Sequence, residues 1–220
     1  MQKGKQKILI LSDIHYPMKC SSLAFPILER EKPDFLVLLG DSVELSKSSH
    51  HVELWKSFLQ KLYMHITPDK IILILGDNDY SNDRKVYSFV SRIEKYNNDV
   101  KKYSIGNMFF YHGNIEKTRI QEKIEYKTAR FFYNISKRSV PFIVSKLVYL
   151  KMHPPHSYYK FIGHIHYLGK YGNTIFCGTL SKKRVIYDEK NSFGYVIVYA
   201  NNFRIEKPSD IIIVREGACK

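Results

Sequence analysis

The chain has 220 residues and a formal net charge of +14 at pH 7, from 35 Lys or Arg against 21 Asp or Glu. With 44% hydrophobic and 25% charged residues it can bury a sizeable core, which excludes general disorder. No stretch approaches the roughly 18 apolar residues of a membrane span, and the first apolar run is too short for a signal peptide. We therefore expect a cytoplasmic protein, and its positive charge favours phosphorylated or polyanionic partners.

The three cysteines are Cys20, Cys177 and Cys219. Their number is odd, they lie far apart, and no pair has C-x-x-C spacing, so the sequence predicts neither a disulfide framework nor a thiolate zinc site. A reducing compartment fits this pattern best.

Short apolar runs alternate with helical patterns through the first half of the chain. Residues 7–12, 35–39 and 70–75 are apolar enough for strands that are buried on both faces. Between them, residues 21–31 and 51–64 carry apolar side chains at helical spacing. This βαβαβ pattern predicts an α/β fold with parallel crossovers.

Two further strands, at residues 108–111 and 159–162, enclose the least sheet-like part of the sequence. Helical stretches are expected at residues 115–138 and 140–151, split at Pro141. We interpret the chain as a single domain, residues 1–220, with a basic helical insertion at residues 115–151. The tail is expected to add short strands at residues 174–177, 195–200, 203–206 and 211–214.

Acidic and histidine residues directly follow five of these expected strands. In open α/β sheets, ligands bind beyond the carboxyl ends of the strands, so side chains from separate loops should meet there. The residues in question are Asp13 and His15 after the first strand, Asp41 after the second, Asp77 after the third, His112 after the fourth, and His164 and His166 after the fifth.

Carboxylates and imidazoles without a thiolate suit manganese, iron(II) or zinc better than magnesium or calcium alone. In Asp13-x-His15 and in His164-x-His166 the two side chains point to the same side of the strand end, so each pair can bind one ion. Asp41 has two carboxylate oxygens and could bridge two ions about 3.5–4 Å apart. The pattern therefore predicts a metal site.

The ordered motifs Asp13-x-His15, Gly40-Asp41-x-x-Glu44, Gly76-Asp77-Asn78-Asp79, His112-Gly113 and Gly163-His164-x-His166 resemble those of the calcineurin-like metallophosphoesterase superfamily. The resemblance spans residues 7–168. It implies two facing, mostly mixed sheets flanked by helices, an αββα sandwich, and a two-metal phosphoesterase. It also implies Asp13, His15 and His166 on one metal, His112, His164 and Asp77 on the other, and Asp41 between them, with Mn²⁺ first and Fe²⁺ or Zn²⁺ as alternatives.

The third motif departs from the family, which usually has Gly-Asn-His-Asp or Gly-Asn-His-Glu. Here Asp77 replaces the metal-binding Asn, and Asn78 replaces the His that assists the departing oxygen. Asn78 cannot act as a general acid, a role worth about 10²–10⁴-fold in rate. We expect His153 or His156 to supply the proton, unless the leaving group is already acidic.

The resemblance implies that a metal-bridging hydroxide attacks phosphorus in a phosphodiester or a nucleotide-type pyrophosphate. Glu44 and the basic insertion are also similar to the branch that cleaves the pyrophosphate of UDP-diacylglucosamine. The usual His-Gly-Asp of that branch is here His112-Gly113-Asn114.

Two other functions remain open at this point. The charge of +14 would assist a nuclease that acts on DNA or RNA. Because Asn78 cannot act as an acid, the chain could also be a scaffold that retains the fold but no longer hydrolyses a substrate. The segment 130–151 has three interpretations: core-facing amphipathic helices, a lid over the substrate, or a face for peripheral membrane contact or nucleic acid.

Several polar residues near the motifs have ordinary structural explanations. Glu44 could support a ligand or a loop. Asp79 is expected to cap a helix or loop. The histidines outside the motifs are expected to be solvated or to cap helices; they are His50, His51 and His65.

Overall fold

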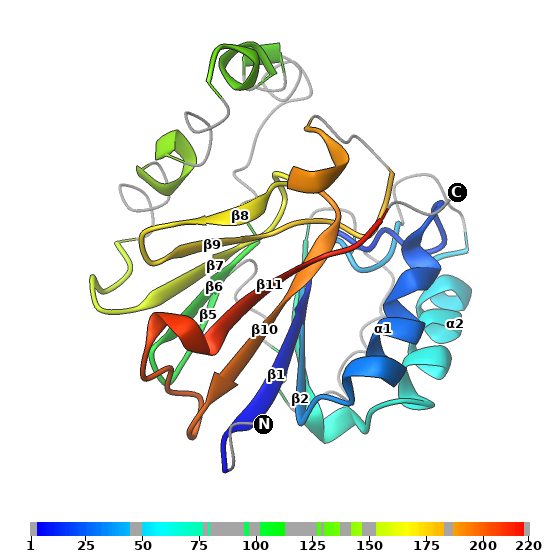
Figure 1. The fold of residues 1–220 in the computed structure, drawn as a ribbon. Coiled ribbons are helices and arrows are strands. Elements are labelled where there is room, and N and C mark those ends of the chain that lie inside the picture. Colours follow the sequence, from blue (N-terminus) through cyan, green and yellow to red (C-terminus); the bar gives the residue numbers. More distant parts are fainter. Residues whose placement is uncertain are drawn as a thin grey trace.

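A computed structural model of the protein is shown in Figure 1. It describes residues 4–44, 50–76, 79, 95–96, 102–112, 127–128, 130–136, 142–146, 153–182 and 187–217. The strands are β1 (Gln6–Leu11), β2 (Phe35–Leu39), β3 (Ile71–Ile74), β4 (Lys95–Tyr96), β5 (Lys102–Ile105), β6 (Met108–Tyr111), β7 (Tyr159–Ile162), β8 (Leu168–Tyr171), β9 (Thr174–Cys177), β10 (Gly194–Ala200) and β11 (Ile211–Arg215). The labelled helices are α1 (Ala24–Glu31) and α2 (His51–Tyr63), with short 3-10 helices η1 (Ser21–Leu23), η2 (Pro68–Lys70), η3 (Glu189–Asn191) and η4 (Pro208–Asp210).

The strands form two mixed sheets. In the first, the order is β11-β10-β1-β2-β3-β4, and β1 to β4 run parallel while β10 and β11 are antiparallel to their neighbours. In the second, the order is β5-β6-β7-β9-β8, with β6, β7 and β9 parallel. Parallel strands require long crossovers, which α1 and α2 provide in the first sheet.

The core between the sheets is built from alternate residues of the strands. Ile8 and Ile10 of β1 pack in one cluster with Phe110 of β6 and Phe161 of β7. The residues between them point the other way, because successive side chains of a strand face opposite sides. Leu9 and Leu11 accordingly belong to a second cluster, on the outer face of the first sheet.

Helices α1 and α2 cover that outer face (Figure 1). Ile27 and Leu28 of α1, together with Trp55 and Phe58 of α2, pack against it. The outer face of the second sheet is smaller and includes Tyr111, Ile162 and Phe176. With helical residues of the insertion beside it, this arrangement is the αββα sandwich that the resemblance implies.

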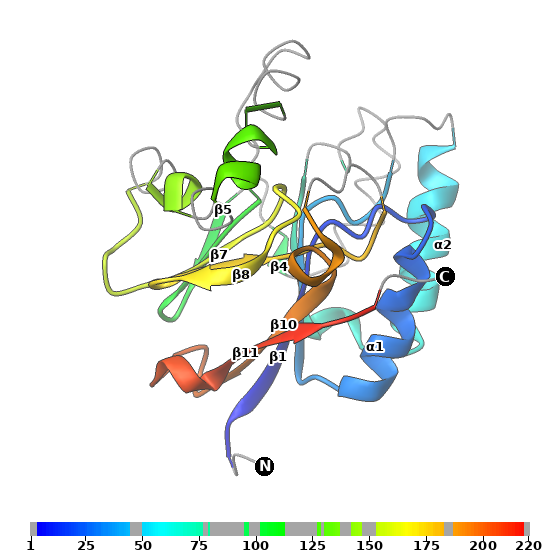
Figure 2. The same ribbon diagram turned by 45° about the horizontal axis from the view of Figure 1, so that its top comes forward.

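The insertion is helical at residues 127–128, 130–135 and 142–146. In both views it stands apart from α1 and α2, beyond β8 (Figures 1 and 2). Tyr133 packs edge-on against Tyr187, with ring centroids 4.8 Å apart, and Val144 packs against the outer face of the second sheet. The expected helices at residues 115–138 and 140–151 are thus confirmed over the residues described there.

The expected strand at residues 203–206 is wrong. Asn201 and Arg204 exchange two backbone hydrogen bonds of 3.0 and 2.8 Å, and Asn202 and Phe203 between them have positive φ angles of 46° and 60°. This is a tight hairpin turn, which an asparagine favours. The aromatic ring of Phe203, which suggested a strand, packs on Phe35 instead, with centroids 4.7 Å apart.

Three strands were not expected: β4, β5 and β8. Each lies at the edge of its sheet, where only one neighbour constrains the sequence. Residues 168–171, for example, have two buried residues followed by two exposed ones rather than an apolar run. The hydrophobic pattern of such edge strands is too weak to predict them from the sequence.

The cysteines also correct an expectation. Cys20 is disulfide-bonded in the structure, whereas Cys177 is a buried free thiol. Because disulfides occur inside the cells of some thermophilic organisms, this bond does not by itself identify a compartment. Across the part of the chain that the structure describes, no helix is long and apolar enough to cross a membrane.

Candidate metal centre

Six of the seven expected metal ligands lie together at the carboxyl ends of parallel strands from both sheets. Asp13 and His15 follow β1, Asp41 follows β2, His112 follows β6, and His164 and His166 follow β7. They form two groups of three: Asp13, His15 and His166, and Asp41, His112 and His164. Within each group the ligand atoms lie within 4.8 Å of one another.

Hydrogen bonds join the loops of the first sheet beyond the ends of the strands. The backbone N–H of Asp13 donates to Gly40 O (3.1 Å), and that of His15 donates to Asp41 O (2.8 Å). A parallel bridge between Tyr16 and Val43 extends this pairing further. The two loops therefore hold their ligands in fixed register instead of fraying from the sheet.

Five of the six ligands have a left-handed backbone. The φ angles are 51° at Asp13, 52° at His15, 50° at Asp41, 65° at His164 and 52° at His166. Such angles are uncommon outside glycine and cost on the order of 1 kcal/mol or more per residue. The surrounding fold imposes this strain at the ligands themselves, which is typical of a functional site.

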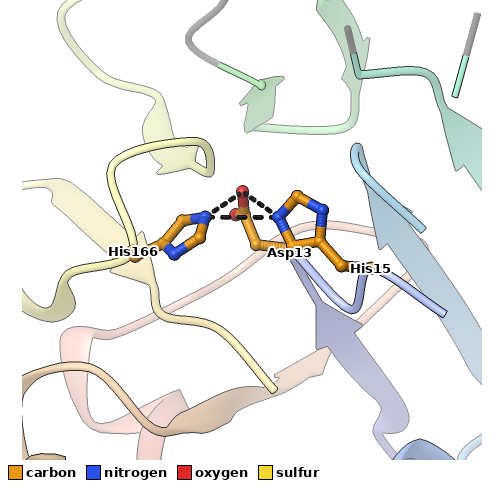
Figure 3. A group of neighbouring side chains, drawn as sticks. All are labelled: Asp13, His15 and His166. Carbon is orange, nitrogen blue, oxygen red and sulfur yellow. Dashed lines mark hydrogen bonds and ion pairs between the residues drawn. The ribbon is translucent and has the colours of Figure 1, made fainter. Parts of the chain in front are cut away.

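Figure 3 shows the first group around the carboxylate of Asp13. His166 Nε2 lies 3.2 Å from Asp13 Oδ1, and His15 Nε2 lies 4.0 Å from the same oxygen. The two Nε2 atoms are 3.4 Å apart. All three side chains are almost completely buried, so they share a small volume that bulk water does not fill.

Asp41 lies between the two groups. Its Oδ2 is 3.6 Å from His15 Nε2 in the first group, and its Oδ1 is 3.4 Å from His112 Nε2 in the second. His164 completes the second group and packs edge-on against His112, with ring centroids 5.2 Å apart. One carboxylate thus presents a different oxygen to each group.

The hydrogen bonds behind the rings fix which nitrogens face the cluster. His112 Nδ1 donates to the carbonyl of Leu39 (3.0 Å), because a carbonyl oxygen can only accept. His15 Nδ1 is bonded to Glu44 Oε2 at 3.0 Å, and Glu44 is itself buried. When such a ring is neutral, its Nε2 carries a lone pair that faces carboxylate oxygens. A cation between these acceptors would satisfy both, so these residues fit divalent ions.

The other oxygen of Asp13 is held by protein donors. Oδ2 accepts from the Ser12 hydroxyl (2.5 Å) and from the backbone N–H of His164 (2.8 Å). Oδ1 is buried and receives no hydrogen bond from the described residues, which leaves it available as a ligand. Burial raises the pKa of Asp13, but the neighbouring imidazoles, above all His166, outweigh burial and hold it below its usual value.

Asp79 is a buried carboxylate that supports the centre from behind. It accepts hydrogen bonds from the backbone N–H groups of Val43 (2.7 Å) and Gly76 (3.0 Å), and so ties the loop after β2 to the loop after β3. Burial, and secondly the charge of Asp41, raise its pKa to about 7. The expectation that Asp79 caps a loop agrees with these contacts.

Glycines leave room for the ligands. A Cβ atom on Gly76 would lie 2.2 Å from Asp41 Oδ1, and one on Gly40 would lie 2.1 Å from His112 Nδ1. A Cβ on Gly163 would lie 2.4 Å from the Ser12 hydroxyl. No real Cβ contact is this short, so these three glycines are required by the space that His112, Asp41 and Ser12 occupy.

The structure does not bring His153 and His156 to this cluster. Both are exposed in the loop that precedes β7, at the amino end of the strand, whereas His164 and His166 follow its carboxyl end. This position argues against the general-acid role expected of them. Asp77 and Asn78 lie outside the described residues, so the expected ligand and the expected catalytic position remain predictions.

The remaining histidines belong to α2 or lie next to its ends. His50 precedes α2 and is exposed, as is His65 after the same helix. The ring of His65 stacks on Phe25, with centroids 6.4 Å apart. The backbone of His51 opens α2. For the two whose side chains are described, these positions agree with a solvated role.

Two supporting residues were not expected from the sequence. Ser12 binds the Asp13 carboxylate, and the Thr179 hydroxyl donates to the backbone oxygen of Asp13 (2.7 Å). Thr179 comes from the loop after β9, which is parallel to β7 and ends at the same edge. The signal was available, because Gly178-Thr179 follows a strand as the other motifs do.

Comparisons with known proteins agree with this geometry. The family model described as calcineurin-like phosphoesterase matches residues 6–178 of the chain. A search of the curated proteins finds no match.

Two solved structures match over nearly the whole length of the chain. A metallophosphoesterase from Sphaerobacter thermophilus is 15% identical, with a TM-score of 0.52, and the match covers 98% of this chain and 89% of that one. This likeness supports the fold. A conserved protein from Streptococcus pneumoniae TIGR4, described as a predicted phosphoesterase, is 16% identical with a TM-score of 0.39, over 97% of this chain and 99% of that one.

Proposed function

This chain belongs to the calcineurin-like phosphoesterase family, and on that premise we propose that it hydrolyses a phosphodiester or a nucleotide-type pyrophosphate with two divalent ions. The family supports a metal-dependent hydrolase of phosphoesters. The number of ions and the class of substrate are our inference from the residues of this chain.

The position of Asp41 is the observation that carries the two-metal proposal. Its two oxygens face imidazole nitrogens of different groups, at 3.6 Å from His15 Nε2 and 3.4 Å from His112 Nε2. Each group has three ligand-type side chains, too few to complete the coordination of one ion but enough to hold it with an open position. A shared carboxylate between two open sites is the arrangement that hydrolytic two-metal centres require.

Two divalent ions at this place would lower the pKa of an attacking water and neutralise the charge on the phosphoryl oxygens. The residues of the chain supply preorganisation. Glu44 fixes the tautomer of His15, Leu39 O fixes that of His112, and Asp79 holds the loops after β2 and β3 together. Because these groups are already in place, little reorganisation is needed when substrate binds.

The preference for an acidic leaving group follows from position 78. The sequence has Asn78 there, and an amide cannot donate a proton to a departing alkoxide as an acid would. His153 and His156 lie at the other end of β7 and do not replace it. A phosphoanhydride, or a diester with an acidic alcohol, departs without such help. This chemistry supports pyrophosphates and activated diesters over simple monoesters.

We propose Mn²⁺ as the ion, with Fe²⁺ and Zn²⁺ as alternatives. The six described ligands are two carboxylates and four imidazoles, with no thiolate among them. Imidazole-rich sites suit these metals, whereas magnesium and calcium prefer oxygen ligands.

An activity screen tests the proposal. The purified protein is supplied with Mn²⁺, Fe²⁺ or Zn²⁺ and assayed on a nitrophenyl phosphodiester, a nitrophenyl monoester and a nucleotide pyrophosphate. We expect turnover of the diester or the pyrophosphate, and loss of at least about a hundredfold in kcat for Asp41→Asn. Asp69→Asn, at an exposed aspartate of η2, is the matched control. Inactivity with all three ions on all three substrates would overturn the proposal.

A nuclease is the second candidate, because the net charge of +14 favours a polyanionic substrate. Salt separates the two functions. Binding of a nucleic acid should weaken steeply between low and moderate salt as counterions are released, whereas turnover of a small substrate should change little. A steep salt dependence of cleavage, measured on single-stranded and double-stranded DNA and on RNA, would favour the nuclease.

A further inference from the structure

The exposed apolar side chains of this protein gather on the insertion. Among the described residues, eight large hydrophobic side chains are exposed, and five of them belong to helical residues 130–135 and 142–146. A sixth, Tyr171 of β8, packs edge-on against one of these five, Phe142, with centroids 5.5 Å apart. We call the set the insertion patch; its members are Phe131, Phe132, Ile135, Phe142, Ile143 and Tyr171.

Two members of the patch lie on one face of a helix whose other face is anchored. Phe131 and Ile135 lie four residues apart, on the same side of the helix, and are 62% and 66% exposed. Tyr133 lies opposite and is only 6% exposed. Its hydroxyl donates to Asp188, and its ring packs on Tyr187. The helix is therefore attached to the domain through one side and leaves its apolar side outward.

Basic residues surround the patch, and acidic ones are missing from its segment. Residues 126–151 contain six Lys or Arg and no Asp or Glu. Among the described ones, Lys127, Arg130 and Lys146 are exposed. Lys146 Nζ also lies 5.8 Å from the centre of the Phe142 ring, which places a positive charge at the edge of an apolar side chain. Cations around aromatic and aliphatic groups are typical of helices that lie in a membrane interface.

From this arrangement we propose that the insertion patch docks the protein on the surface of an anionic phospholipid bilayer. Phe131 and Ile135 would enter the boundary between headgroups and acyl chains, and Arg130 and Lys146 would pair with anionic headgroups. A second copy of the chain is a poorer partner, because two basic surfaces repel each other. A nucleic acid would use the aromatic rings but leave the isoleucines without a role.

A series of tyrosine contacts links the helix that carries part of the patch to the loop of a metal ligand. Tyr187, which holds Tyr133, also packs against Tyr167, with ring centroids 5.3 Å apart. Tyr167 directly follows the ligand His166 in the sequence. The docked face and the metal centre are therefore connected through three tyrosine rings that pack edge-on, although docking itself needs no metal and does not depend on the proposed hydrolysis.

Vesicle sedimentation tests the proposal. The full chain is mixed with vesicles of phosphatidylcholine alone, or of equimolar phosphatidylcholine and phosphatidylglycerol, at low and moderate salt. We expect binding to the anionic vesicles that weakens as salt is added. The double variant Phe131→Ser, Ile135→Ser should bind at least roughly tenfold more weakly, and Arg130→Gln, Lys146→Gln roughly tenfold more weakly, with less salt dependence.

Matched controls come from exposed residues elsewhere. Met64→Ser with Ile212→Ser removes apolar groups that are 80% and 42% exposed, and Lys56→Gln with Lys70→Gln removes exposed charges of α2 and η2. Both pairs should bind vesicles like the unaltered protein. Melting temperatures equal to that of the unaltered protein would show that each variant is folded.

Several results would overturn the proposal. These are no binding to anionic vesicles, equal loss in patch and control variants, or a patch variant that loses only self-association or only binding of a single-stranded oligonucleotide. Asp41→Asn should bind vesicles normally. A protein that binds vesicles without hydrolysing any phosphoester would contradict the proposed function alone, and one that hydrolyses without binding would contradict only this inference.

Discussion

The metal centre and the insertion patch are built on opposite principles. At the centre, polar side chains are buried, and their positions are fixed by strand ends, paired loops and five left-handed residues. At the patch, apolar side chains are exposed, and the helix that carries them is attached through few residues, Tyr133 among them. Polar side chains are usually exposed and apolar ones usually buried, and each region departs from this rule. Buried polar groups and exposed apolar patches indicate binding sites more reliably than ordinary packing does. If this comparison is right, changes at the centre should affect metal and activity, while changes at the patch should leave both intact.

The largest effect is expected for Gly76→Ala. The backbone of Gly76 is not left-handed, so alanine adds only a Cβ, which would lie 2.2 Å from Asp41 Oδ1 and 2.7 Å from His112 Nε2. Asp41 must move, and we expect kcat to fall by about a thousandfold. Gly217→Ala is the control, because no atom lies within 4 Å of a Cβ there. Activity near the unaltered level in Gly76→Ala would show that Asp41 is not shared.

A second effect concerns pH and the buried carboxylate of Asp79. Its pKa is about 7 in the folded protein, against 3.8 for an unperturbed group. The folded state therefore binds this proton more tightly than the unfolded state does. The resulting contribution to the free energy of unfolding is fully present below pH 4 and is lost as pH rises through 7. The total is on the order of 4 kcal/mol.

The measurement is urea denaturation of the metal-free protein from pH 4 to pH 8, with Asp79→Asn for comparison. The free energy of unfolding of the unaltered protein should fall over this range by more than that of Asp79→Asn. Asparagine also loses one of the two hydrogen bonds to Val43 and Gly76, so the slope with pH, not the absolute value, is the informative quantity. Parallel curves for the two proteins would refute a raised pKa of Asp79.

A third, smaller effect is expected for Glu44→Ala. This change removes the acceptor of His15 Nδ1 at 3.0 Å and frees the ring to rotate or change tautomer. Loss of such a supporting carboxylate costs about 10–100-fold in metal affinity. Glu44→Gln keeps an oxygen that can accept the same proton and should lose much less. Equal losses in the two variants, measured by titration with Mn²⁺, would point to packing instead of tautomer control.

The smallest effect is expected for a change in the insertion, Tyr133→Phe. Tyr133→Phe removes a hydroxyl that donates to Asp188 and accepts from Asn191 (3.1 Å). We expect about 1 kcal/mol of local stability to be lost, seen as faster hydrogen exchange at residues 130–136. Tyr171→Phe, at a side chain that is 42% exposed, is the control. Loss of metal affinity in Tyr133→Phe would show that the two regions are not independent.

Sequence patterns predicted the strands that carry the ligands because those strands are largely buried on both faces and are therefore mostly apolar. The boundaries of β2, for example, match the expected range of residues 35–39. The six described ligands could be found because each follows such a strand. Edge strands such as β8, and the turn at Asn202 and Phe203, escaped prediction because pairing and backbone angle decide them, not hydrophobicity.

The supporting residues were harder to predict than the ligands. The bond from Glu44 to His15 spans 29 positions, and that from Thr179 to Asp13 spans 166, so only the folded chain shows them. The place of His153 and His156 likewise depends on the direction of a strand. They precede β7, at its amino end, whereas the ligands His164 and His166 follow its carboxyl end.

A crystal structure with Mn²⁺, using the anomalous signal of the metal, would show whether Asp41 is shared between two ions. We expect two peaks about 3.5–4 Å apart, one contacted by Asp13, His15 and His166, the other by His112 and His164, with an oxygen of Asp41 on each. A single peak, or two peaks of which Asp41 contacts only one, would contradict it.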